Sequence, residues 1–152
     1  MKTTKHFALA SLLVVGATLS ASTPARAQGG GYAVLDCVVG VGDPDYGASG
    51  GVSAGGTILY GGVSNNGTYY VVVNCRVILA CSDLTPGATY SFSVGGKTFK
   101  AHQDGSAEVT LKNIQLVFYA GPDGYDCYTP LVVSRQNPNG TWTPVLAADI
   151  PW

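Results

Sequence analysis

Few residues of this chain could carry out acid–base catalysis. Beyond the first 27 residues the one histidine is His102, and Asp104 lies two positions after it. The two could act as a general base and its orienting carboxylate. However, Asp104-Gly105 is also a turn dipeptide, and a turn explains Asp104 without catalysis. The one glutamate, Glu108, alternates with Ala107 and Val109, which places it on the solvent side of a strand. The sequence therefore predicts a protein that is not an enzyme.

Four cysteines offer either disulfide or metal chemistry: Cys37, Cys75, Cys81 and Cys127. No Cys-x-x-Cys spacing is present, so no metal site is predicted. Cys75 and Cys81 would lie about 20 Å apart on one continuous strand, which is too far for a bridge. Two structural disulfides are therefore predicted. We favour Cys37–Cys75 with Cys81–Cys127, because it ties the N-terminal strand to the middle of a long strand. The alternative is Cys37–Cys81 with Cys75–Cys127.

The N-terminal segment has the three parts of a secretory signal peptide. Lys2 and Lys5 form its charged start, residues 7–19 are mostly apolar, and Ala25-Arg26-Ala27 supplies small residues at the cleavage site. Such a leader is typical of bacteria and predicts a secreted, extracellular or periplasmic protein. We expect a signal peptide at residues 1–27 and a single domain at 28–152, in a compartment where disulfides persist.

The charge of the predicted mature domain excludes some classes of partner. Loss of the leader would leave five cationic side chains against nine acidic ones. No Lys/Arg cluster is present, so the sequence predicts no binding to nucleic acid. Charged residues make up 11% of the chain, well below the usual ~25%. Residues 28–152 contain no apolar stretch long enough to span a bilayer, so no transmembrane segment is expected.

Two loops carry paired aspartates, Asp43 with Asp45 and Asp123 with Asp126. Calcium binds several oxygen ligands, but neither loop matches a known calcium-binding pattern, and turn chemistry explains both. No cofactor is predicted, and calcium binding at either loop stays an open alternative. Asn66-Gly67-Thr68 and Asn139-Gly140-Thr141 fit the glycosylation pattern, although an Asn-Gly hairpin turn explains each of them.

Aromatic side chains among Gly, Ser and Asn are the best candidates for a binding surface. Tyrosine offers a large contact area at low entropic cost, and such compositions are typical of binding loops. The predicted ligand-binding residues are Tyr46, Tyr60, Tyr125 and Trp142.

These side chains must be positioned by strands, because apolar runs alternate with Gly, Pro, Asn and Asp turns every eight to twelve residues. In the segment 69–81 the odd positions carry no polar side chain, so we expect them, with both of its cysteines, to face a core. Residues 47–56 are so rich in Gly and Ser that we interpret them as a loop. Seven to nine strands are expected at 33–41, 57–63, 68–80, 89–94, 97–102, 106–111, 114–120, 131–135 and 141–147.

The run Leu84-Thr85-Pro86-Gly87-Ala88-Thr89-Tyr90, continuing to Val94, resembles the tyrosine corner of fibronectin type III and related immunoglobulin-like domains. The resemblance implies an antiparallel immunoglobulin-like β-sandwich, in which Leu84 fills the core and the Tyr90 hydroxyl bonds back to the corner. The four cysteines and the Gly95-Gly96 hairpin depart from that family. A fainter likeness links residues 105–111 and Asp126-Cys127 to neocarzinostatin-type sandwiches.

The function that these patterns favour is a secreted, non-enzymatic β-sandwich that binds a macromolecule, a glycan or a small ligand through Tyr/Gly-rich loops. Two alternatives stay open. One is a self-assembling structural surface protein, suggested by the low charge and by the outer face at Tyr70, Val72 and Ile78. The other is a secreted inhibitor of a hydrolase.

Overall fold

The computed structural model describes residues 28–38, 45–124 and 126–152, and the predicted leader at 1–27 lies outside these ranges. Within them the chain is all-β, with one short 3₁₀ turn, η1 (Val94–Gly96). Eight strands agree with the predicted seven to nine, and no helix in the described ranges is long and apolar enough to cross a membrane. The strands are β1 (Gln28–Cys37), β2 (Ser49–Val63), β3 (Tyr69–Ser82), β4 (Thr89–Phe92), β5 (Lys97–Lys100), β6 (Ala107–Ala120), β7 (Cys127–Gln136) and β8 (Trp142–Pro151).

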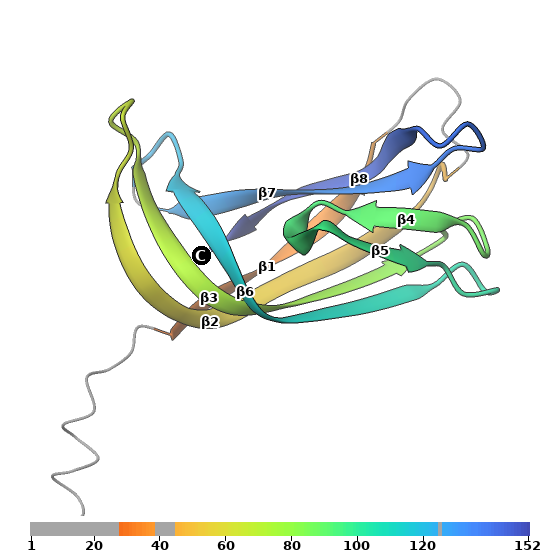
Figure 1. Cartoon of the computed structure of the whole chain (residues 1–152), viewed down its shortest axis with the longest axis horizontal. Helices are drawn as coiled ribbons and strands as arrows, with labels where there is room; N and C mark the ends of the chain where they lie inside the picture. The colour runs from red at the N-terminus through yellow and green to blue at the C-terminus, as the bar shows by residue number, and fades with distance from the viewer. Residues whose placement is uncertain (1–27, 39–44, 125) are drawn as a thin grey trace, which may run out of the picture.

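Six of the strands close into an antiparallel barrel (Figure 1). The pairing runs β7–β6–β3–β2–β1–β8, and β8 returns to pair with β7. One edge of β7 pairs with β8 along most of its length, while the other edge changes partner. It meets β6 at Cys127 and Tyr128 and then meets β4 at Val133 to Arg135. The β4–β5 hairpin therefore occupies the place beside β7 that β6 leaves.

Two bulges bend the long strands and reset which side chains face inward. The first separates Ile58 from Tyr60 on β2, and the second lies opposite Arg76, where β6 carries Lys112 and Asn113. Asn113 has a left-handed φ of 55°, a conformation that asparagine adopts more readily than most residues. The two predicted strands 106–111 and 114–120 are therefore one bent strand. Buried positions on β6 change from odd to even numbers across this bulge: Ala107, Val109 and Leu111 before it, and Phe118 after it.

The prediction of a loop at residues 47–56 was wrong for most of that segment. Residues from Ser49 onward belong to β2, and Val52 and Ala54 are buried in the core. The glycines here allow neighbouring chains to approach closely: a Cβ on Gly56 would lie 2.1 Å from the Asn74 carbonyl oxygen. The small side chains of this segment therefore allow β2 to pack closely against its neighbouring strands.

Adjacent glycines on β2 provide a matched test of this packing. A Cβ on Gly55 would meet no atom within 4 Å, whereas one on Gly56 would collide with the backbone of β3. We expect Gly55→Ala to leave stability unchanged or raise it by about 0.5 kcal/mol, and Gly56→Ala to destabilise the fold by more than about 1 kcal/mol. Urea unfolding of both variants measures the difference. Equal midpoints would contradict the close approach of the two strands.

The core follows the predicted alternation on β3. Val73, Cys75, Val77, Leu79 and Cys81 are all buried, so the expected inward face is confirmed. The predicted corner geometry is also present. Leu84 is buried, and the Tyr90 hydroxyl accepts a hydrogen bond of 2.9 Å from the Thr85 amide. The corner leads from β3 into β4, the fourth of the eight described strands.

The predicted disulfides are not found, and all four cysteines are free. Cys81 lies opposite Ala107 at one end of β6, and Cys127 lies opposite Ala120 at the other, a separation along the strand of about 40 Å. The favoured Cys81–Cys127 pair was therefore wrong, because a bridge needs Cα atoms within about 7 Å.

The alternative pairing fails for the same reason. Cys75 lies opposite Ile114 on β6, which is about 20 Å along that strand from Ala120, the residue opposite Cys127. Cys75 lies opposite Gly56 of β2, whereas Leu35, two residues before Cys37, lies opposite Gly50, so Cys37 and Cys75 lie at different heights of the sheet and do not meet either.

Alkylation measures this directly. We expect protein denatured without reductant to take up label at four cysteines, as counted by intact mass. Burial raises the pKa of Cys75 to about 11 and that of Cys81 to about 12, so in the folded protein at pH 8 both should react more slowly than Cys37, whose side chain is only partly buried. If fewer than four cysteines were labelled in the unreduced protein, a disulfide would be present and the finding of four free cysteines would be wrong.

Candidate functional site

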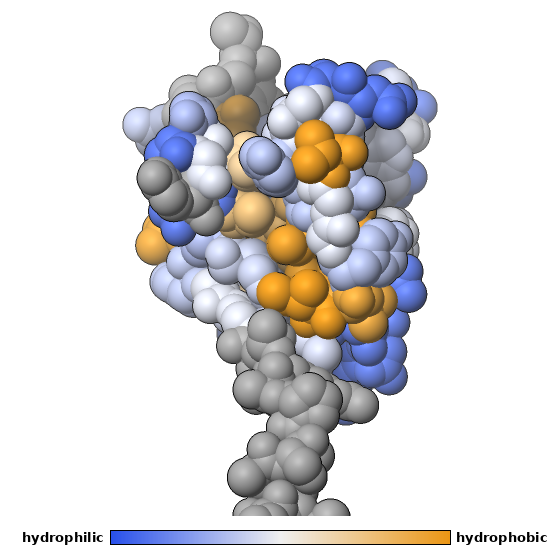
Figure 2. Space-filling model, turned by 90° about the vertical axis from the view of Figure 1, so that its left-hand side faces the viewer, coloured by the Kyte–Doolittle hydropathy of each residue, from blue (hydrophilic) through white to orange (hydrophobic). Residues whose placement is uncertain are grey.

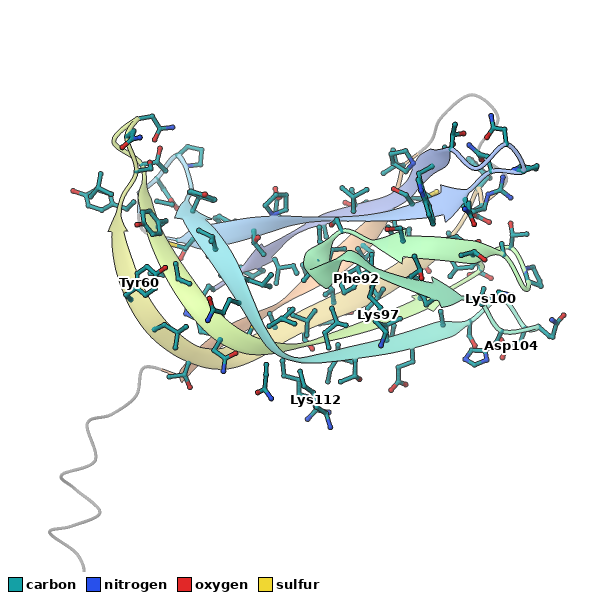
Figure 3. The ribbon with its side chains drawn as sticks, viewed as in Figure 1. Tyr60, Phe92, Lys97, Lys100, Asp104 and Lys112 are labelled. Atoms are coloured by element: carbon teal, nitrogen blue, oxygen red, sulfur yellow. The ribbon has the colours of Figure 1, made fainter. Side chains whose placement is uncertain are left out.

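The predicted binding residues lie at two ends of the molecule. Tyr46 is 77% exposed and follows Asp45, which bonds to the β3–β4 corner. Trp142 starts β8, opposite Gln136 and close to that same corner. Tyr60 lies on β2 opposite Val72, toward the β2–β3 hairpin at the other end (Figure 3). Tyr125 lies outside the described residues. More of the described aromatic residues lie at the end with the β2–β3 hairpin, and a cavity is also found there.

The cavity opens at the mouth of the barrel, between the β2–β3 hairpin and the β6–β7 turn. It has a volume of about 430 Å³ and is lined by Gly67, Thr68, Tyr69, Ala120, Gly121, Pro122 and Gly124. Figure 2 shows this end of the molecule as two lobes with a hollow between them, and hydrophobic colour lies in and below the hollow. The lining residues come from two glycine-rich hairpin turns, and the predicted binding residues Tyr46, Tyr60 and Trp142 are not among them.

The register explains why the mouth is apolar. Val63 lies opposite Tyr69, and Gly61 opposite Val71, on the inward side of β2 and β3. Beyond the closed part of the barrel these inward side chains lose their cover, so Val63 is 55% and Tyr69 63% exposed. Deeper in, Ile58, Val71 and Leu116 are only partly buried against the core. An apolar inner face is therefore open to solvent at this end.

Both rims of the mouth are stiffened by hydrogen-bonded turns. In the β2–β3 hairpin the Gly67 amide donates to the Ser64 carbonyl at 2.9 Å, and the Thr68 amide donates to the Asn66 side-chain oxygen at 3.2 Å. In the β6–β7 turn the Gly121 amide donates to the Asp126 carbonyl at 2.7 Å. Gly67 and Gly124 have the positive φ values of 84° and 74° that these turns require. The cavity is thus largely preformed.

The described residues of the lining are uncharged. Its polar groups are the Tyr69 and Thr68 hydroxyls and the peptide groups of the two turns. Cys127 lies opposite Ala120 at the edge of the mouth. Burial, with the charges of Asp126 and Asp123, raises the pKa of its thiol and makes it a poor nucleophile at neutral pH. The mouth is suited to binding an uncharged ligand.

The candidate catalytic groups lie elsewhere and serve turns. Asp104 accepts hydrogen bonds from the Ser106 amide at 2.9 Å and the Ser106 hydroxyl at 2.7 Å, and these bonds lower the pKa of its carboxyl group. The His102 amide bonds the Ser106 carbonyl across the same turn. Glu108 lies on β6 opposite Ala80 and is exposed, as expected.

Ser49 and Ser53 each occupy the serine position of a Gly-x-Ser-x-Gly stretch. A nucleophile elbow places its serine on a sharp turn between a strand and a helix. Both serines instead belong to β2, with Ser49 as its first residue, and β2 is followed by strand β3 rather than by a helix. The Ser49 hydroxyl is 3.1 Å from that of Ser82. Neither serine has the geometry of an elbow.

The paired aspartates and the Asn-Gly-Thr sequences do not form ligand sites among the described residues. Asp45 is turned into the fold rather than toward a loop site, and Asp43 lies outside the described residues. Asp126 and Asp123 are joined through an amide-to-carboxylate contact of 3.5 Å. The side-chain oxygen of Asn139 accepts from the Thr141 amide at 3.0 Å, as in an Asn-Gly hairpin turn. No group of three or more His, Cys, Asp or Glu in the described ranges could hold a metal ion.

Asp45 is the centre of a buried polar cluster that the sequence did not predict. Its carboxylate accepts hydrogen bonds from the Thr85 amide at 2.8 Å, the Thr85 hydroxyl, and the Tyr90 hydroxyl at 3.0 Å. It also lies 3.8 Å from Nε of Arg135 on β7. The cluster joins the start of the Tyr46 turn to the β3–β4 corner and to β7. The only earlier indication was the corner motif, which identified Tyr90 but not its acidic partner.

The ionisation of Tyr90 reports on this cluster. Burial, together with the negative charge of Asp45, raises the pKa of Tyr90 to about 12. The unfolded chain ionises near pH 10, so this contribution to stability is intact below pH 10 and is lost as the pH rises toward 12. We expect the urea midpoint of the wild type to fall between pH 10 and 12, and to fall less in Tyr90→Phe. Parallel decreases would contradict the raised pKa.

A scan against protein-family models, a search of curated proteins and a search of solved structures each gave no match to this chain.

Proposed function

We propose that this chain is a secreted, non-enzymatic binding protein that holds an uncharged, partly apolar small molecule in the mouth of its barrel. The cavity between the β2–β3 hairpin and the β6–β7 turn carries this proposal. Its volume of about 430 Å³ falls within the ~300–1,000 Å³ of typical ligand pockets. Barrel mouths are a frequent place for such pockets.

The chemistry of the mouth supports the choice of ligand. Tyr69 and Val63 present exposed apolar surface, and the glycine-rich rims present peptide groups that could bond a hydroxyl or carbonyl of the ligand. The described lining residues carry no charged side chain, so an anionic ligand would lose its hydration without gaining a partner.

The test uses N-phenyl-1-naphthylamine, an uncharged dye whose fluorescence rises in apolar sites. We expect the wild type to enhance its fluorescence and Ala120→Leu, which fills the cavity, to bind it at least tenfold more weakly. The matched control is Gln115→Leu, a similar change at an exposed position of the same strand. Absence of binding to the wild type, or equal binding by the two variants, would overturn the proposal.

Secretion is part of the proposal and rests on the leader-like pattern of residues 1–27. Expression of the full chain in a Gram-negative bacterium should yield periplasmic or medium protein that begins at Gln28, as read by N-terminal sequencing. Uncleaved protein retained in the cytoplasm would contradict this part.

For the fold we propose an immunoglobulin-like sandwich whose two sheets have joined into the barrel. Support comes from the pairings of β3 with β6 and β4 with β7, which match by chain order the B–E and C–F neighbours of that fold. β5 then takes the place of the C′ strand of variable-type domains. An experimental structure in which β4 pairs with a strand other than β5 or β7 would contradict the assignment.

A further inference from the structure

The outer wall beside the mouth carries a group of tyrosines that the proposed small-molecule site does not use. Tyr70 lies opposite Tyr119 and Tyr119 lies opposite Tyr128, so the three stand in line across β3, β6 and β7. Tyr60 adjoins them on β2, opposite Val72. We call these four residues the tyrosine row. They face outward, because directly paired residues share one face of a sheet, and Tyr60 and Tyr119 are 57% and 47% exposed.

The rings of the row are ordered by their neighbours. Those of Tyr70 and Tyr119 have centroids 6.2 Å apart and are tilted by 52°. Tyr70 lies over Gly62, where a Cβ would be 2.8 Å from its hydroxyl oxygen. Val72 faces outward beneath them, yet it is only 5% exposed. The Tyr70 and Tyr119 rings at the centre of the row are therefore packed before any partner binds.

Negative charge gathers at one end of the row. The Tyr128 hydroxyl lies 3.5 Å from the Asp126 carboxylate. The pKa of Tyr128 is raised chiefly by the charge of Asp126, with further contributions from Asp123 and Asp149. All three carboxylates are exposed.

The cations of the described residues lie elsewhere. Lys97 and Lys100 are on β5, and Lys112 is at the bulge of β6 (Figure 3). Arg76 is opposite that bulge on β3. Arg135 is engaged with Asp45. The row thus combines aromatic faces with the carboxylates of Asp126 and Asp149, to which no cation of the described residues is paired.

We propose that the tyrosine row is a docking surface for an extended segment of a partner protein that carries arginine or lysine side chains. Aromatic faces attract cations through their quadrupoles, and the carboxylates near Tyr128 complement the same charge. The row crosses four strands, a span of about 14 Å between the outer strands, on the outside of the barrel. That shape favours an extended chain over a small enclosed cation.

The probe is the capped peptide Ac-(Pro-Arg)₄-NH₂, whose affinity is measured by tyrosine-ring NMR shifts, with Ac-(Pro-Glu)₄-NH₂ as the charge control. We expect the arginine peptide to bind and the glutamate peptide not to bind. Tyr119→Ala should weaken binding about threefold to tenfold, as should the pair Asp126→Asn with Asp149→Asn. Tyr119→Phe should retain the affinity, since it keeps the ring. Tyr46→Ala removes an exposed tyrosine at the other end and should have no effect.

Other results would overturn the proposal. These are failure of the arginine peptide to bind, equal binding of both peptides, or binding that Tyr119→Ala leaves unchanged. Dimerisation that Tyr119→Ala abolishes would assign the row to a second copy of this chain instead. If tetramethylammonium displaced the arginine peptide at equal molar concentration, the row would be a site for a small cation instead. The Ala120→Leu variant should bind the arginine peptide like wild type, so the row and the mouth are tested separately.

Discussion

Replacement of Asp45 by alanine should destabilise the domain by about 3–5 kcal/mol, among the largest effects of any single substitution. The Asp45 side chain is fully buried, and its carboxylate receives hydrogen bonds from Thr85 and Tyr90. In its absence the Tyr90 hydroxyl loses its acceptor. Nε of Arg135, which is buried without a hydrogen-bond partner among the described residues, loses its counter-charge. Urea unfolding at pH 7 measures the loss.

Two further variants separate the causes. If the uncompensated cation accounts for part of the loss, the double variant Asp45→Ala with Arg135→Met should regain part of the stability. Asp36→Ala serves as the control, because Asp36 is an exposed residue of β1, and it should change stability by less than about 0.5 kcal/mol. Equal effects of Asp45→Ala and Asp36→Ala would contradict a structural role for the buried carboxylate.

Replacement of Phe118 by alanine should cost a similar amount, about 3–5 kcal/mol. Phe118 is fully buried, and its ring lies 5.1 Å from that of Trp152 with a tilt of 48°. The Trp152 amide donates to the Cys127 carbonyl at 2.8 Å, so this ring pair also holds the end of the chain against β7. The cavity left by alanine would disturb the inner wall beneath the mouth as well as the core.

The neighbouring position provides the control. Tyr119 faces outward and is 47% exposed, so Tyr119→Ala should lower stability by less than about 1 kcal/mol. Phe118→Leu should fall between the two, since it keeps part of the apolar volume. If Tyr119→Ala destabilised the domain more than Phe118→Ala, the alternation after the β6 bulge would be wrong.

The turns could be predicted because their chemistry is local. Asn139 caps its own turn through Thr141, and Asp104 does so through Ser106. Gly67 takes the positive φ that an Asn-Gly hairpin requires. In each case the deciding atoms lie within a few residues of one another, so the amino-acid types alone specify the geometry.

The disulfides could not be predicted, because a bridge depends on register over the whole sheet. Cys75 and Cys81 were correctly placed on the inward face of β3, yet facing inward does not bring two thiols together. The height of each cysteine along the barrel is set by pairings such as Cys81 with Ala107 and Cys127 with Ala120. These pairings join residues far apart in the chain, which no local pattern encodes.

By itself, the sequence determined the strand class, the turns, the inward face of β3 and the tyrosine corner. Those features follow from backbone preferences and from alternation over a few residues. The tertiary structure alone decided that the glycine-rich segment is strand β2 and that Asp45 is buried against Tyr90. It also brought Tyr70, Tyr119 and Tyr128 into one line. The physical reason is that long-range strand register, and not residue type, determines which distant side chains become neighbours.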